Sequence, residues 1–194
     1  MTESLFNAIA LRVEDYRQDV FDPSLELAIE IAREGREGRR IGTLLTIGQA
    51  DAVMAASRPL ILDPLACHPP QLRRITDPGL RGTLKELAQL DGAFVLSDDG
   101  IVVAACRYLN ASADDIDLPL GLGSRHLAAA SISKRCGATA IVVSESAVVR
   151  VFDRGTLAAE ILPELWLLSR YHTQLRGQVD TQQVEDLAIL TPGR

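Results

Sequence analysis

The feature that most restricts the fold is a pair of β-rich runs joined by a tight-turn signal, AFVLSDDGIVVAACRYL at residues 93–109. Asp99-Gly100 separates the two runs, and this dipeptide is strongly favoured in β-hairpin turns. Strands joined by so short a connection pair antiparallel within one sheet. The chain is therefore expected to contain a sheet with at least one antiparallel pair.

Helical patterns alternate with further strand-like runs along the chain. Leu25, Ala28, Ile29 and Ala32 recur at helical spacing after Pro23-Ser24, and glycines follow at 35 and 38. Buried strands are expected at 41–48, 138–146 and 147–152, and helices at 83–90 and from the glycine turn at 121–123 to Gly137. Hairpins combined with helical crossovers predict the α/β class, a single domain with a central mixed, partly antiparallel sheet flanked by helices.

Composition excludes several classes of protein. Hydrophobic residues make up 47% of the 194 residues, which is enough for a core, and the net charge of -6 disfavours nucleic-acid binding through phosphates. No apolar run reaches the roughly 18 residues of a membrane span, and no basic-then-apolar leader is present. The three cysteines, Cys67, Cys106 and Cys136, show no CxxC spacing, which favours a reducing compartment. We expect a cytoplasmic protein without nucleic-acid or membrane partners.

The stretch GLGSRH at residues 121–126 is the first candidate site. It is not a dinucleotide fingerprint, because its sixth residue is histidine and a loop precedes it. Ser124 can cap a helix whose first N–H groups attract anions, and Arg125 supplies a planar donor fork suited to phosphate. His126 can donate to phosphate or bind a metal. The alternative is a surface arginine and a buried, hydrogen-bonded histidine at a helix start.

Two further candidates are short and weak when taken alone. In Asp91-Gly92-Ala93, a carboxylate at a strand entry can hold a divalent metal or accept a proton, and the small residues allow close ligand approach. Ser144-Glu145 ends a strand, a common ligand position in α/β sheets. The structural alternatives are a turn-capping aspartate and a solvated turn.

The three candidates together, in this order, resemble the diadenylate cyclase domain family, found in DNA-integrity scanning proteins and cyclic di-AMP synthases. That family carries Asp-Gly-Ala, then Gly-Thr/Ser-Arg-His-Arg-Ala-Ala, then a Ser-Glu-Glu-like strand end. Here these are Asp91-Gly92-Ala93, GSRHLAA at 123–129, and Ser144-Glu145. The resemblance covers roughly 25–160. We therefore divide the chain into an N-terminal helical extension (1–24), a cyclase-like nucleotide-binding domain (25–160) and a C-terminal helical tail (161–194).

The resemblance implies a metal-dependent nucleotidyltransferase. Each subunit of a homodimer or higher homo-oligomer would bind one ATP with Mg²⁺ or Mn²⁺. Across a face-to-face dimer the two ATP would condense into cyclic di-AMP and two pyrophosphates. It assigns catalysis to Asp91, Arg125 and His126, and metal binding to Asp91, His126 and Glu145. It assigns nucleotide binding to Gly92, Ala93, Leu109, Gly123, Ser124, Arg125, His126, Ser144 and Glu145.

Two positions depart from the family pattern. Leu127 stands where the family usually has a second arginine, and Ser146 where it often has a second acidic residue. Three hypotheses follow: a working diadenylate cyclase, a catalytically impaired module that binds ATP or cyclic di-AMP, and an α/β interaction scaffold without a nucleotide.

Overall fold

The computed structural model describes residues 8–114, 116–163, 179–184 and 187–192. A seven-stranded sheet runs in the order β2-β4-β3-β1-β5-β6-β7. β1 and β3 are parallel, and every other neighbouring pair in this sheet is antiparallel. The prediction of a mixed α/β fold is confirmed. The strands are β1 (Thr43–Ile47), β2 (Ser57–Pro59), β3 (Ala93–Leu96), β4 (Val102–Leu109), β5 (Thr139–Val143), β6 (Val149–Asp153) and β7 (Thr156–Ile161).

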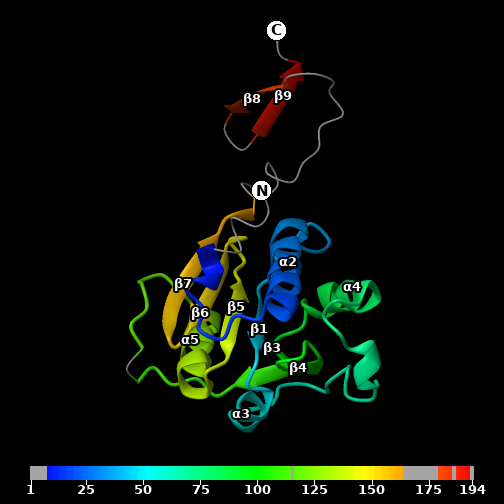
Figure 1. The fold of residues 1–194 in the computed structure, drawn as a ribbon, viewed down its shortest axis with the longest axis vertical. Helices are drawn as coiled ribbons and strands as arrows, with labels where there is room; N and C mark the ends of the chain where they lie inside the picture. The colour runs from blue at the N-terminus through cyan, green and yellow to red at the C-terminus, as the bar shows by residue number, and fades with distance from the viewer. Residues whose placement is uncertain (1–7, 115, 164–178, 185–186, 193–194) are drawn as a thin grey trace.

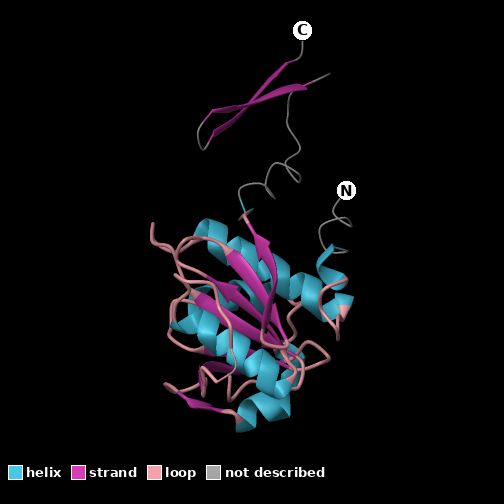
Figure 2. Cartoon of the chain, turned by 90° about the vertical axis from the view of Figure 1, so that its left-hand side faces the viewer, coloured by secondary structure: helices cyan, strands magenta, loops and turns pink. Residues whose placement is uncertain are grey.

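Helices lie on both faces of the sheet (Figures 1 and 2). They are α2 (Gln18–Glu34), α3 (Ala50–Ala55), α4 (Pro78–Leu87) and α5 (Ser124–Cys136), together with the short 3-10 helix η1 (Pro70–Leu72). The strands β1 and β5 are buried along their whole length, as expected for strands covered on both faces. Their alternate side chains therefore enter two separate cores.

One core lies under α2 and the other under α5. Leu45 and Ile141 belong to the first, with the buried face of α2. Leu44 and Val142 belong to the second, with Ala129 of α5. Because side chains alternate along a strand, Leu44 and Leu45 are assigned to opposite faces by the pleat alone. This arrangement holds α5 on the face that Leu44 lines.

The hairpin predicted from Asp99-Gly100 is present. β3 pairs antiparallel with β4, and Gly100 has φ of 79° in the connection. Gly100 N donates to Ser97 O at 3.1 Å, and Ser97 N donates to Ile101 O at 2.9 Å, which closes the turn. The predicted end of α5 is also confirmed, because Gly137 is its C-cap in the left-handed conformation that favours glycine.

Several element boundaries differ from the sequence prediction. α2 begins at Gln18 rather than at Pro23-Ser24, so the proposed boundary at residue 24 falls inside a helix. α4 begins at Pro78, five residues before the predicted start, because Asp77 caps it by accepting from Leu80 N at 2.8 Å. β7 was not predicted, since its TLAAEI sequence holds alanine and glutamate, which are depleted in strands, and pairing with β6 outweighs that propensity.

The described residues near the two chain ends test the predicted terminal helices only in part. Residues 8–10 are helical, within the expected N-terminal helical extension. Residues 164–178 of the expected helical tail lie outside the described residues. Beyond them, β8 (Val179–Val184) and β9 (Leu187–Pro192) pair antiparallel, so this part of the expected helical tail is a hairpin. Among the described residues, no helix is both long and apolar enough to cross a bilayer.

Candidate functional site

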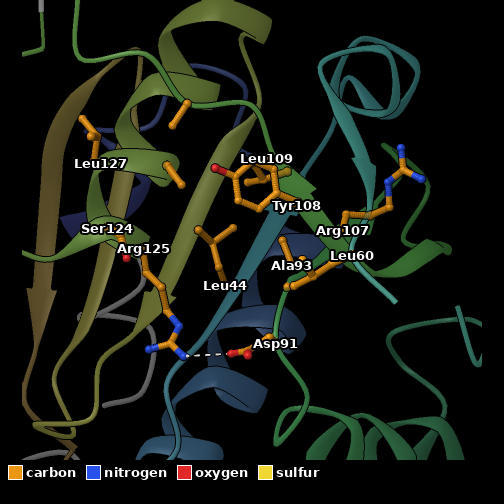
Figure 3. A pocket seen from close by; sticks show the side chains of 13 residues that line it. Leu44, Leu60, Asp91, Ala93, Arg107, Tyr108, Leu109, Ser124, Arg125 and Leu127 are labelled. Atoms are coloured by element: carbon orange, nitrogen blue, oxygen red, sulfur yellow. Dashed lines mark ion pairs between the residues drawn. The ribbon is translucent and has the colours of Figure 1, made fainter. Parts of the chain in front are cut away.

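A pocket of about 530 Å³ lies where the entry to β3, the end of β4 and the first turn of α5 meet (Figure 3). This volume is typical of sites for small organic ligands. Six of the residues that the sequence assigned to a site line it, and they come from separate segments of the chain. The full lining is Leu44, Leu60, Asp91, Gly92, Ala93, Arg107, Tyr108, Leu109, Ala111, Ser124, Arg125, Leu127 and Ala128.

Asp91 and Gly92 form the turn that enters β3. The Asp91 side chain is 81% exposed at the pocket edge. Gly92 has φ of 109°, and a Cβ there would lie 2.6 Å from the carbonyl carbon of Cys106. Cys106 itself has φ of 54°, and the β3–β4 register shifts between the pairs Ala93↔Arg107 and Val95↔Ala104. Gly92 is thus required by the close approach of a bulge in β4.

α5 begins differently from the sequence prediction. Its N-cap is Gly123, Ser124 is its first helical residue, and no side chain makes a capping hydrogen bond. Gly123 O accepts from His126 N at 3.0 Å and from Leu127 N at 3.2 Å. The Ser124 hydroxyl is therefore not used as a cap, and it lines the pocket together with the positive end of the helix.

Arg125 brings two of the predicted acidic residues together. Its Nη1 donates to Glu145 Oε1 at 3.0 Å, and its Nη2 lies 3.7 Å from Asp91 Oδ1. Figure 3 shows the Arg125 side chain extending along the pocket edge to Asp91. The Arg125 side chain is 39% exposed, and that of Glu145 is 67% exposed. The guanidinium therefore stands between the two carboxylates and offers its remaining N–H groups to the pocket.

His126 does not line the pocket. It is 7% exposed, and its ring lies against Phe152 in an edge-on arrangement with centroids 6.2 Å apart. Arg150 Nη1 donates to His126 Nε2 at 3.1 Å, because a guanidinium can only donate. The adjacent positions Arg125 and Leu127 do line the pocket, so the turn of the helix directs His126 to the β6 side instead.

The electrostatics of His126 favour the neutral ring. Burial lowers the pKa of His126, and the positive charges of Arg150 and Arg125 lower it further. With Nε2 accepting, Nδ1 carries the proton, and this atom is buried without a hydrogen-bond partner in the described part of the chain. His126 is therefore a buried histidine that joins α5 to β6, which is the structural alternative considered from the sequence.

The expected metal ligands Asp91, His126 and Glu145 do not converge. Within the described residues, no group of three His, Cys, Asp or Glu side chains is placed to hold a metal ion. Ser144 does not line the pocket. Its hydroxyl lies 2.6 Å from the Ser146 hydroxyl and accepts a hydrogen bond from Val148 N at 3.3 Å. Ser144 thus stabilises the β5–β6 turn. Leu109, expected near the base or ribose, is buried and lines the pocket.

Sequence reasoning missed several lining residues, including Leu44, Leu60, Arg107 and Tyr108. Arg107 is held in place, because its Nη2 donates to Met54 O at 3.2 Å and to Ser57 O at 3.0 Å. Tyr108 is 46% exposed, and the Arg58 guanidinium lies 4.4 Å from its ring centroid. The only signal for Arg107 and Tyr108 was that they directly precede Leu109, which the sequence had selected.

The fold and the pocket define an α/β domain with a pocket beside the N-terminus of α5. Residues 30–157 match the family described as the DisA bacterial checkpoint controller nucleotide-binding domain, also called DAC. The chain belongs to this family, and the resemblance noted from the sequence is confirmed.

Two curated relatives share this region. The chain is 48% identical over 145 residues to a diadenylate cyclase of Methanocaldococcus jannaschii, covering 74% of this chain and 46% of that protein. It is 44% identical over 150 residues to a diadenylate cyclase of Haloferax volcanii, covering 77% of this chain and 53% of that protein. The chain therefore spans about half the length of these relatives.

One solved structure shows the same fold. It is described as the hypothetical membrane spanning protein from Bacillus cereus, with a TM-score of 0.50 and 23% sequence identity. The match covers 69% of this chain and 59% of that one.

Proposed function

We propose that this protein is a diadenylate cyclase. The observation that carries the proposal is the meeting of Asp91 and Arg125, from the two segments that resemble the family motifs, at the edge of one pocket of suitable size. Two relatives that bear the name diadenylate cyclase support the same activity. In the proposed reaction the 3′-hydroxyl of each ATP attacks the α-phosphorus of the other. Two P–O bonds form, two pyrophosphates leave, and the two hydroxyl protons are lost.

The pocket provides separate surfaces for the two ends of ATP. Leu44 and Leu109 give an apolar wall for the adenosine, and Tyr108 lies beside them. The first turn of α5 and Arg125 give the positive end of a helix and a guanidinium for the phosphates. Negative charge grows on the phosphate oxygens during transfer, so fixed positive groups at that end lower the barrier.

Asp91 has the chemistry for a divalent metal. Mg²⁺ is commonly held by one or two carboxylates together with substrate phosphates rather than by a complete protein cage. The exposed Asp91 carboxylate at the pocket edge fits that arrangement, and the absence of a three-ligand cluster in the described residues does not conflict with it. When bound, Mg²⁺ or Mn²⁺ would offset phosphate charge. Asp91 would also accept the proton of the attacking hydroxyl.

We assign His126 a structural role in place of the catalytic and metal-binding roles expected from the sequence. Because it contacts Arg150 and Phe152 rather than the pocket, we assign it to holding the first turn of α5 against β6. It would then act through Arg125 and Ser124, as a positioning residue.

The reaction needs two ATP molecules, and each chain holds one copy of the motif residues Asp91 and Arg125 that meet at the pocket edge. We therefore propose a homodimer in which the pockets of the two subunits face each other. If the pairing is weak, dilution of the protein should lower the rate per subunit.

The residues are tested by following pyrophosphate release from ATP with Mg²⁺ or Mn²⁺. Asp91→Asn and Arg125→Ala are each expected to reduce the rate by about tenfold to a hundredfold or more, since a charged hydrogen bond contributes about 1.5–3 kcal/mol. Asp15→Asn is the control, because Asp15 is exposed and outside the pocket lining. Full activity in both site variants would refute the assignment.

A second candidate is a module that binds ATP or cyclic di-AMP without turnover. Leu127 favours it, because this residue lines the pocket where the family usually has a second arginine. This function predicts ATP binding without pyrophosphate release, and it predicts that Leu127→Arg restores release. Steady release from the unaltered protein would exclude it.

A further inference from the structure

The position of Arg125 depends on a residue that neither the motifs nor the pocket lining include. Gly42 precedes β1, and a Cβ on this residue would lie 2.6 Å from Arg125 Nη1 and 3.0 Å from Arg125 Cζ. It would also lie 3.3 Å from Glu145 Cγ. A Cβ carbon does not approach an atom to which it is not covalently linked so closely, so the Arg125 guanidinium occupies space that exists only because residue 42 has no side chain.

The surroundings of the guanidinium form a three-sided cradle, which we define as Gly42, Glu145 and Asp91. Gly42 supplies a bare backbone surface, Glu145 accepts from Nη1 at 3.0 Å, and Asp91 lies 3.7 Å from Nη2. A free arginine side chain has about 2 kcal/mol of rotamer entropy to lose on ordering. A guanidinium already held in one orientation has less left to lose when a phosphate binds, so the cradle prepares Arg125 for its ligand.

The backbone conformation does not explain the glycine at position 42. Gly42 does not have a positive φ, whereas eight other described glycines do. The atoms that a Cβ would meet belong to flexible side chains rather than to the backbone. Alanine at this position therefore leaves the main chain unstrained, displaces the Arg125 guanidinium and presses on the Glu145 side chain that holds it.

We propose that Gly42 is a positioning residue for the proposed ATP site, acting through Arg125. The inference rests on the proposed function, because it takes phosphate as the ligand of Arg125. It also assigns Glu145, which was expected to bind metal and phosphate, to the orientation of Arg125.

The test is a double-mutant cycle read by the dissociation constant for ATP, measured by titration calorimetry. Gly42→Ala is expected to raise this constant about tenfold. In an Arg125→Ala background the same change should alter it less than twofold, because the group that Gly42 positions is gone. Glu145→Ala removes another side of the cradle and should behave in the same way.

Gly82→Ala is the matched control. Gly82 lies in α4, and a Cβ added to it would meet no atom within 4 Å, so this variant should bind ATP as the unaltered protein does. Thermal melting checks that each variant is folded.

The outcomes separate the two proposals. Equal ATP affinity of Gly42→Ala and the unaltered protein, or an equal loss with and without Arg125, would overturn the role of Gly42 while leaving the cyclase proposal intact. Absence of ATP binding by the unaltered protein would overturn both. The dissociation constant for ATP is measured separately from product formation. The role of Gly42 can therefore be tested even if the chain binds ATP and forms no product.

Discussion

Replacing Gly92 by alanine should lower the free energy of unfolding, whether or not a ligand is present. The added Cβ would lie 2.6 Å from the Cys106 carbonyl carbon, 2.7 Å from Cys106 Cα and 2.8 Å from Arg107 N. All three are backbone atoms of the bulge in β4, so no side chain can rotate away to relieve the contact.

The magnitude follows from two independent terms. A residue with a Cβ at φ of 109° pays about 1–2 kcal/mol for a conformation that glycine tolerates. Forcing a methyl group against packed backbone costs about 1–3 kcal/mol more. The free energy of unfolding should therefore fall by about 2–5 kcal/mol. With a urea m-value of about 2 kcal/mol per molar, the midpoint should fall by about 1–2.5 M.

Urea unfolding followed by circular dichroism measures this change. Gly82→Ala should move the midpoint the opposite way, because alanine is favoured over glycine in a helix interior by about 1 kcal/mol. If Gly92 is needed only so that a nucleotide can approach the backbone, Gly92→Ala would unfold at the same urea concentration as the unaltered protein and lose only ATP binding. That result would refute the steric explanation.

Three further predictions concern other parts of the site and its support. Burial lowers the pKa of His126 in the folded state, so the contribution of the neutral ring to the free energy of unfolding is complete above the ordinary histidine pKa of about 6.5 and is lost as pH falls through the folded-state pKa. His126→Gln should therefore make the free energy of unfolding, measured with urea, fall less steeply between pH 7.5 and pH 5.5. An unchanged slope would contradict a buried, neutral His126. Asp77→Ala should lower the free energy of unfolding by about 1 kcal/mol, because Leu80 N loses its cap acceptor; no change in a urea titration would show that the cap does not contribute. Arg107→Lys should lower the melting temperature, since an ammonium cannot reproduce the fork to Met54 O and Ser57 O; an unchanged melt would count against that anchoring role.

The parts of the fold that could be predicted are those with a local physical cause. Asp99-Gly100 sets the β3–β4 turn, and the glycine after α5 sets its end, because each requires a backbone conformation that few residues adopt. The runs that form β1 and β5 hold only apolar residues and threonine, which is typical of strands covered on both faces. These features can be deduced without knowing what packs on them.

The parts that could not be predicted depend on contacts between distant segments. β7 forms because it can pair with β6, although its own residues have low strand propensity. Asp91 and Arg125 were selected together only through the family resemblance, since nothing in their spacing brings them to one pocket. The cradle role of Gly42 could not be deduced at all, because it depends on where the Arg125 side chain lies.

His126 illustrates the limit of a motif. The sequence places it next to Arg125, and the two were expected to share the phosphate and metal chemistry. Successive residues in a helix differ by about 100° in direction, so neighbours in sequence face different surroundings. Only the packing of α5 on β6 decides that Arg125 faces the pocket and His126 faces Arg150.

We propose that this chain joins two ATP molecules into one cyclic product. The most direct measurement is mass spectrometry of the products formed from an equal mixture of unlabelled and isotope-labelled ATP with Mn²⁺ or Mg²⁺. We predict that cyclic di-AMP made from one labelled and one unlabelled ATP is about twice as abundant as the unlabelled product or the fully labelled product. All three products should be lost in Asp91→Asn. Conversion of ATP to ADP or AMP alone, or no conversion with either metal, would contradict the claim.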